Sequence, residues 1–194
     1  SSYTQKWTYN VGNPIIKVDS TPSCSLISAS TVGCSVYLFR KSGKLLWEKE
    51  VEYEAWSTDI ADDGSLIAAG TANKTPSDGK VHIIRRSGEN ILSKDIGAPV
   101  WDVEFDDRNR RLIVTTWDNR LILFSREDEE FIKKKTVNIG NHGLYGVESL
   151  NGQNLVVAAS YDDGIYIFDS ELQNYEKVSI NDGLYNISLI NEDT

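Results

Sequence analysis

Cysteine is scarce in this 194-residue chain, with Cys24 and Cys34 as its two thiols. A globule of this length buries roughly 70% of the surface of its unfolded chain, so it needs no disulfide staple. The strand pattern described below puts the two thiols at opposite ends of one short strand, beyond the roughly 7 Å that a bridge allows between Cα atoms. We therefore expect two free thiols, which favours a reducing compartment such as the cytoplasm.

Long apolar runs and basic residues are also in short supply. No apolar run reaches 18 residues, so the sequence predicts no membrane span. Lys and Arg number 20 against 29 Asp and Glu, a net charge of −9. That balance opposes nucleic-acid binding, which depends on Lys and Arg displacing cations from phosphates. It suits a basic or neutral protein partner.

A unit of three short strands separated by two turns covers Val100 to Phe124. Trp101 anchors its first strand. Equivalent anchors recur at intervals of about 40 to 45 residues, the period of a propeller blade, at Ile16, Trp56, Tyr145 and Tyr185. The second strand recurs as LISAST (26–31), LIAAGT (66–71), LIVTTW (112–117) and LVVAAS (155–160). The third recurs as VYLF (36–39), VHII (81–84), LILF (121–124) and IYIF (165–168).

A fourth, more polar strand follows each third strand, and no helical period appears in the chain. The sequence therefore predicts an all-β fold, a β-propeller or partial propeller with four complete four-stranded blades in one repeat domain. The expected blades cover approximately 14–51, 54–96, 99–137 and 143–180. Residues 6–11 are expected as a lone outer strand and 184–190 as a lone inner strand of another blade. Either the native polypeptide continues or a second chain supplies the missing strands.

Two sets of motifs resemble known repeat families. The runs SGKLLW (42–47) and RSGENIL (86–92) resemble quinoprotein-like (PQQ-like) propeller repeats, although the glycine–tryptophan ending is kept only at Gly43 and Trp47. The phrases VWDVEF and DDGSLIAAGT resemble WD-type repeats. The resemblance implies a propeller whose relatives mostly act as assembly scaffolds or sensors, with a minority of quinone-dependent dehydrogenases. The chain carries no quinone or calcium signature that could be transferred from these families.

Each expected inner strand alternates between an apolar and a polar face. Counting from the anchors, the polar face places one carboxylate at the same level in four successive blades: Asp19, Asp59, Glu104 and Glu148. One interpretation is an acidic channel that holds a cation or a basic side chain. The other is that inner strands simply need polar residues where they face water.

The aromatic anchors Trp56, Trp101, Tyr145 and Tyr185 are expected near the channel mouth. They could form a stacking or cation–π surface for a ligand. Because the same alternation places them on one face with Val103 and Phe105, packing between blades is the alternative. The loop 71–80 is the longest connection and is expected on the same rim, either as a recognition loop or as a tolerated insertion.

These patterns predict that the protein is a non-enzymatic interaction or sensor scaffold, which binds a protein partner through its rim and exposed blade edges. Self-association through open edges is possible, and no cofactor or metal is expected. Neither His82 nor His142 stands beside a nucleophile in a known motif. The alternative is a ligand- or quinone-dependent enzyme built on a larger propeller.

Overall fold

The computed structural model describes residues 4–188 except 76, 107, 151–152, 162–163 and 181. These residues form sixteen strands in four antiparallel sheets of four strands each, which confirms the predicted fold class. In every sheet the strands are neighbours in sequence order. None of the described segments forms a helix of the length and apolarity required to cross a membrane.

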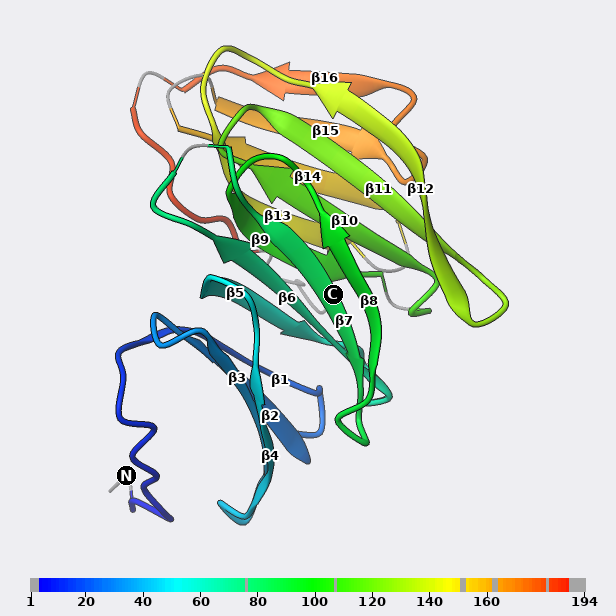
Figure 1. The fold of residues 1–194 in the computed structure, drawn as a ribbon. Coiled ribbons are helices and arrows are strands. Elements are labelled where there is room, and N and C mark those ends of the chain that lie inside the picture. Colours follow the sequence, from blue (N-terminus) through cyan, green and yellow to red (C-terminus); the bar gives the residue numbers. More distant parts are fainter. Residues whose placement is uncertain are drawn as a thin grey trace.

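The first two sheets are β1 (Ile15–Ser20), β2 (Leu26–Thr31), β3 (Ser35–Arg40) and β4 (Leu45–Glu50), then β5 (Glu54–Ile60), β6 (Leu66–Ala72), β7 (Lys80–Arg85) and β8 (Asn90–Asp95). The next two are β9 (Val100–Phe105), β10 (Arg111–Thr116), β11 (Arg120–Glu127) and β12 (Glu130–Asn138), then β13 (Leu144–Leu150), β14 (Leu155–Ser160), β15 (Gly164–Asp169) and β16 (Tyr175–Val178). We call these sheets blades 1 to 4. They follow one another like the leaves of a fan, from blade 1 in blue to blade 4 in orange (Figure 1).

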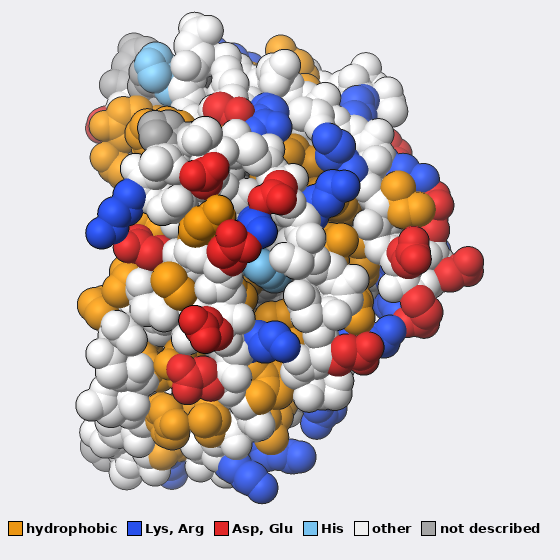
Figure 2. All heavy atoms as spheres, viewed as in Figure 1, with side chains coloured by type: hydrophobic (Ala, Val, Ile, Leu, Met, Phe, Trp, Pro, Cys, Tyr) orange, Lys and Arg blue, Asp and Glu red, His pale blue; other side chains and the backbone are white. Residues whose placement is uncertain are grey.

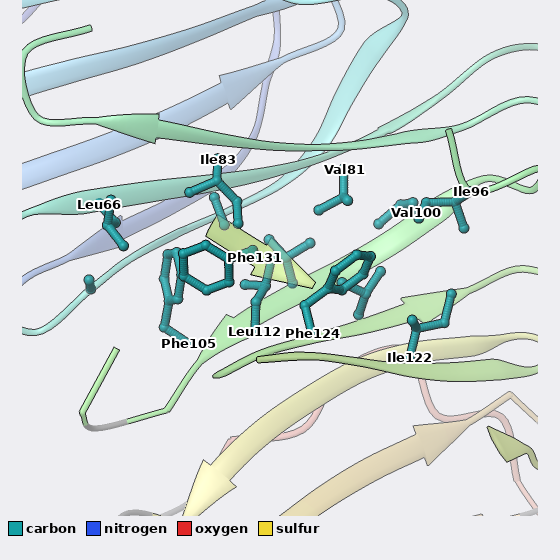
Figure 3. Packing of buried hydrophobic residues seen from close by; sticks show 14 residues of the cluster. Leu66, Val81, Ile83, Ile96, Val100, Phe105, Leu112, Ile122, Phe124 and Phe131 are labelled. Carbon is teal, nitrogen blue, oxygen red and sulfur yellow. The ribbon is translucent and has the colours of Figure 1, made fainter. Parts of the chain in front are cut away.

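The hydrophobic cores lie between blades. One cluster joins blades 2 and 3, with Ile83 and Phe105 among its members, and Figure 3 shows the two sets of side chains meeting. A second cluster joins blades 3 and 4 through Leu123 and Phe168, and a third joins blades 1 and 2 through Leu38 and Ile67. Because both faces of β6 and β10 are covered in this way, their sequences are nearly continuous apolar runs.

The outer strands are the exposed edges of the blades. The middle of β12 carries Lys133, Lys134 and Lys135, of which Lys133 and Lys134 are exposed and Lys135 is half-buried. Figure 2 shows side chains of both signs interspersed along the right-hand edge of the molecule, where these outer strands lie in Figure 1. Charge on an edge strand prevents sheets from pairing edge to edge.

Every inner strand contains a β-bulge at its anchor residue. In β9 the pairing with β10 passes from Val100 directly to Asp102, which leaves Trp101 as the extra residue. The same one-residue shift leaves an extra residue in each of the other inner strands, namely Ile16, Trp56 and Tyr145. A bulge interrupts the alternation of side chains along a strand.

The N-terminal segment covers the outer part of blade 1. Trp7 and Tyr9 pack against Phe39, with ring centroids 5.8 and 5.0 Å away. The indole N–H of Trp7 donates to the carbonyl of Lys41, in the turn between β3 and β4. The predicted strand over residues 6–11 does not form. A strand needs a hydrogen-bonded neighbour, and no described segment pairs with this one.

The C-terminal segment runs beside the inner strand of blade 4. The amide of Leu184 donates to the carbonyl of Tyr161, 2.9 Å away, and the backbone at Ile187 passes close to Gly146 in β13. Residues 184–188 have no strand assignment, and the last two residues of the predicted strand, 189 and 190, lie outside the described residues. The segment nevertheless occupies the side of β13 where a further inner strand would lie.

Candidate functional site: the channel and its aromatic mouth

The four predicted carboxylates come together in one cavity at the centre of the fan. Asp19, Asp59, Glu104 and Glu148 line a polar cavity of about 170 Å3 together with Lys17. They come from β1, β5, β9 and β13, the four inner strands, which lie side by side. The period-based counting therefore placed them at the same level correctly.

Three of these carboxylates join one blade to the next. Asp19 accepts a hydrogen bond from the amide of Ile60 in blade 2 at 2.9 Å, and Asp59 accepts one from the amide of Phe105 in blade 3 at 2.7 Å. Glu104 accepts a longer one, 3.4 Å, from the amide of Ser149 in blade 4. In each case the acid lies three residues after its anchor, and the amide lies four residues after the next anchor. The acids are thus links between blades as well as channel-lining groups.

Lys17 supplies the positive charge in this acidic channel. Its ammonium group lies 2.5 Å from a carboxylate oxygen of Asp102, which belongs to β9, two blades away. The same carboxylate accepts the amides of Val103 at 3.0 Å and Val147 at 3.2 Å. A basic side chain of the protein itself therefore occupies the position that the sequence suggested for a cation or a basic group.

Burial is the largest cause of the pKa shifts of four acids in and beside the channel. It raises the pKa of Asp59 and Glu104 well above their ordinary values of 3.8 and 4.5, and the carboxylates of Asp19 and Glu148 add to the shifts. Burial also raises the pKa of Glu148 and, despite the Lys17 ammonium, that of Asp102. Burial alone would lower the pKa of Lys17, but its carboxylate neighbours, chiefly Asp102, outweigh burial and raise it.

The carboxylates do not assemble into a metal site. Across the described ranges, no group of three or more His, Cys, Asp or Glu side chains is arranged to hold a metal ion. One oxygen of Asp19 and one of Asp59 already accept backbone amides, and Lys17 supplies a positive charge to the same cavity.

The four aromatic anchors contact one another in a row across the channel mouth. Ring centroids are 4.3 Å apart for Trp56 and Trp101, 4.8 Å for Trp101 and Tyr145, and 5.4 Å for Tyr145 and Tyr185. The same four side chains, with Ile16, line an open cavity of about 570 Å3. They therefore pack across the blade boundaries and also border a surface cavity.

The assignment of these anchors to the apolar face with Val103 and Phe105 was wrong. Because Trp56, Trp101 and Tyr145 are each the extra residue of a bulge, the residue before each of them takes the packing position instead. Val100, Ala55 and Leu144 are fully buried, whereas Trp101 is half-buried. The bulge thus releases one large side chain in each of blades 2, 3 and 4 from the core.

Two further aromatic side chains, which the period did not single out, extend this row. Trp117 lies 5.7 Å from Trp101 and 6.1 Å from Tyr145, and Tyr161 lies 5.5 Å from Tyr145 and 5.3 Å from Tyr185. Trp117 and Tyr161 each follow directly after the second strand of their blades, β10 and β14. The alignment of the second strands therefore contained a signal for them, because an aromatic residue follows the second strand in both blades.

These rings enclose a second cavity at the mouth, which we call the aromatic pocket. Its volume is about 350 Å3, and its walls are the rings of Trp117, Tyr145, Tyr161 and Tyr185 with Asn141, His142 and Gly143. Trp117, Tyr161 and Tyr185 are 46%, 38% and 64% exposed, which is high for aromatic side chains. Exposed apolar rings gathered at one place are typical of interaction sites.

The loop 71–80 is held by its own polar groups. The amide of Asn73 donates to the carbonyl of Asp78 at 3.0 Å, and the hydroxyl of Thr75 donates to the Asp78 carboxylate at 2.5 Å. The hydrogen bonds to Thr75, Asn73 and Ser77 lower the pKa of Asp78, so its carboxylate is charged at neutral pH. Residue 76 of this loop lies outside the described residues. Neither the recognition role nor the insertion role is favoured by these contacts.

The glycine–tryptophan ending at Gly43 and Trp47 corresponds to contacts between neighbouring blades. The indole of Trp47 packs beside Gly88 in the β7–β8 turn of the next blade, and its N–H donates to the carbonyl of Arg86 at 3.0 Å. Trp7 makes the equivalent contact with the turn of blade 1 at Gly43. Trp7 therefore takes the place of the outer-strand tryptophan of a preceding blade.

Comparison with known proteins identifies the fold. No family model matches the chain, and no curated protein matches it. Among solved structures, 1386 chains match. One of them is U3-55K, a WD40 β-propeller protein, with a TM-score of 0.74 and 16% sequence identity. The match covers 87% of this chain and 52% of U3-55K, so the chain spans about half the length of that structure.

This comparison agrees with the WD-type part of the sequence resemblance and gives no support to the quinoprotein-like part. At this level of identity it bears on the fold alone. The chain has the fold of a partial WD40-type β-propeller.

Proposed function

We propose that this chain is a non-enzymatic interaction module that binds a protein partner through the channel mouth. The observation that carries the proposal is the aromatic surface, formed by Trp56, Trp101, Tyr145 and Tyr185 together with Trp117 and Tyr161. Aromatic side chains are enriched in protein interfaces, where they provide most of the binding energy. Here six of them gather at one end of the channel.

The rigid support beneath this surface favours such a role. The inner strands that carry the anchors are joined by carboxylate-to-amide bonds such as the one between Asp59 and Phe105. The Lys17–Asp102 ion pair adds a connection between blades 1 and 3. A surface held in this way loses little conformational freedom when a partner binds, which increases affinity.

The charge of the chain indicates what kind of partner fits. With a net charge of −9, it attracts basic surfaces over long range and repels acidic ones. One exposed acid, Asp182, directly precedes Gly183, which lies beside the Tyr161 ring. A basic segment of a partner protein is therefore the favoured ligand.

The histidine in blade 2 fits a structural role better than a catalytic one. His82 lies in β7 opposite Ala69 and Ser93, and it is 5% exposed. Burial lowers its pKa to about 4, so the imidazole is neutral at physiological pH. A buried neutral imidazole within a strand is poorly placed to exchange protons with a substrate.

The test is affinity capture by matched variants. Wild-type protein, a mouth variant (Trp117→Ala with Tyr185→Ala) and a control variant (Tyr175→Ala on the outer strand β16, 55% exposed) are used to capture proteins from a lysate. We expect specific proteins to be retained by the wild type and the control but lost by the mouth variant, and to bind again when purified. Retention of the same proteins by the mouth variant would show that the partner binds elsewhere.

A further inference from the structure

The aromatic pocket has the composition of a cation-binding cage. Four rings from four segments form its walls: Trp117 after β10, Tyr145 in β13, Tyr161 after β14 and Tyr185 after β16. The rings of Tyr145 and Tyr185 meet at 73°, and those of Tyr161 and Tyr185 meet at 76°. Rings set nearly perpendicular to one another enclose a space from several sides.

The geometry leaves the cavity open to a ligand. Its volume of about 350 Å3 lies at the lower end of the roughly 300–1,000 Å3 found for small-ligand sites, enough for one side chain of a partner. Trp117 and Tyr185 are both about half exposed or more. The pocket is thus reachable from solvent and is held in place by contacts among its own rings.

The electrostatics favour a cation over a neutral apolar group. The face of an aromatic ring carries partial negative charge, and several faces around one site attract a cation that has lost much of its water. The hydroxyls of Tyr161 and Tyr185 lie 3.4 Å apart, so they are partners to each other. Asp182, beside the pocket, and the net charge of −9 strengthen the attraction.

We infer that the aromatic pocket binds the alkylated ammonium group of a modified lysine side chain in a basic protein segment. An alkylated ammonium is preferred to an unmodified one because its charge is spread over apolar carbon, which fits aromatic walls and costs less to dehydrate. The inference rests on the proposed function, since it names the group that the channel mouth recognises.

The experiment measures the binding of two small probes to the 194-residue chain. One is N-acetyl-trimethyllysine amide, and the other is its neutral analogue in which carbon replaces the charged nitrogen. Binding is followed by NMR chemical shifts of the tryptophan indole N–H groups and by tryptophan fluorescence. We expect saturable binding of the charged probe, at least about fivefold tighter than that of the neutral analogue, with the Trp117 resonance among those that move.

Variants locate the site. Trp117→Ala should abolish binding of the charged probe, and Trp117→Phe, which keeps a ring, should retain weakened binding. Tyr175→Ala on the outer strand should leave binding unchanged. Thermal unfolding of each variant confirms that it is folded, and because Trp117 is half exposed its removal should be tolerated.

Three results would overturn the inference. Equal affinity for the neutral analogue would show an apolar pocket without preference for charge. Binding that survives in Trp117→Ala would place the site elsewhere. No binding of either probe, while captured partners still depend on the channel mouth, would remove the ammonium preference and leave the proposed function standing. Loss of mouth-dependent capture as well would remove both.

Discussion

The ammonium of Lys17 in β1 and the carboxylate of Asp102 in β9 form an ion pair across the channel, although 85 residues separate them in the sequence. Asp102 is 5% exposed in its side chain and Lys17 is 31% exposed. The pair ties the first blade to the third and neutralises one charge in a cavity otherwise lined by acids.

Removal of one partner should therefore be costly. Lys17→Met leaves the Asp102 carboxylate buried without a counter-ion, and we expect a loss of about 2–4 kcal/mol in the free energy of unfolding, measured by urea denaturation. The double variant Lys17→Met with Asp102→Asn should recover part of that loss because no unpaired buried charge remains. If the double variant is as unstable as the sum of the single ones, the two side chains are not coupled.

The buried acids predict how stability changes with pH. Because burial raises the pKa of Asp59 and Glu104 in the folded chain, these two side chains hold more protons in the folded state than in the unfolded state above about pH 4, and we consider their contribution to stability. This contribution to the free energy of unfolding should then fall as the pH rises from about 4 through the raised pKa values.

Substitutions test that sign directly. Asp59→Asn and Glu104→Gln keep an oxygen to accept the neighbouring amide but remove the titration, so both should be more stable than the wild type at neutral pH and should flatten the pH profile. Glu130→Gln, on an exposed outer strand, serves as the control and should change neither. A difference in stability between variant and wild type that does not grow with pH over this window would contradict the assignment.

The contact between Trp47 and the next blade predicts a graded response. Trp47→Phe keeps a ring beside Gly88 but loses the hydrogen bond to Arg86, so we expect a loss of about 1 kcal/mol by thermal unfolding. Trp47→Ala also loses the packing and should cost about 2–3 kcal/mol. Equal stability of Trp47→Phe and the wild type would mean that the hydrogen bond contributes nothing.

The aromatic row predicts that its central member supports the fold. Trp101 contacts the rings of Trp56, Tyr145 and Trp117, and each aromatic pair contributes about 0.5–1.5 kcal/mol beyond the area it buries. Trp101→Ala should therefore lower the free energy of unfolding by about 2–3 kcal/mol and weaken the near-ultraviolet circular dichroism. An unchanged melting temperature would instead assign Trp101 to ligand contact alone.

The period of the sequence was enough to predict the blades and the level of the acids. Strand order follows from local turns, and Asp19, Asp59, Glu104 and Glu148 were aligned by counting from their anchors. The faces of the anchors could not be obtained in this way, because a bulge shifts the alternation by one residue without changing the repeat length. Counting therefore assigned Trp101 to the same face as Val103 and Phe105.

Side-chain partners that lie far apart in the chain could not be predicted from the sequence. The pairing of Lys17 with Asp102 depends on how far the fan turns between blades 1 and 3, which no local pattern encodes. The N-terminal segment shows the reverse case: the spacing between Trp7 and Trp47 matches the repeat, yet no strand forms at 6–11 because none of the described segments pairs with it.

The carboxylate-to-amide bonds between inner strands have a direction, since each blade provides the acceptor and its successor provides the donor. Substitution of one acid therefore removes one of these hydrogen bonds, between one pair of neighbouring blades. One contact between neighbouring blades can therefore be weakened by mutation while each blade keeps its own internal hydrogen bonds.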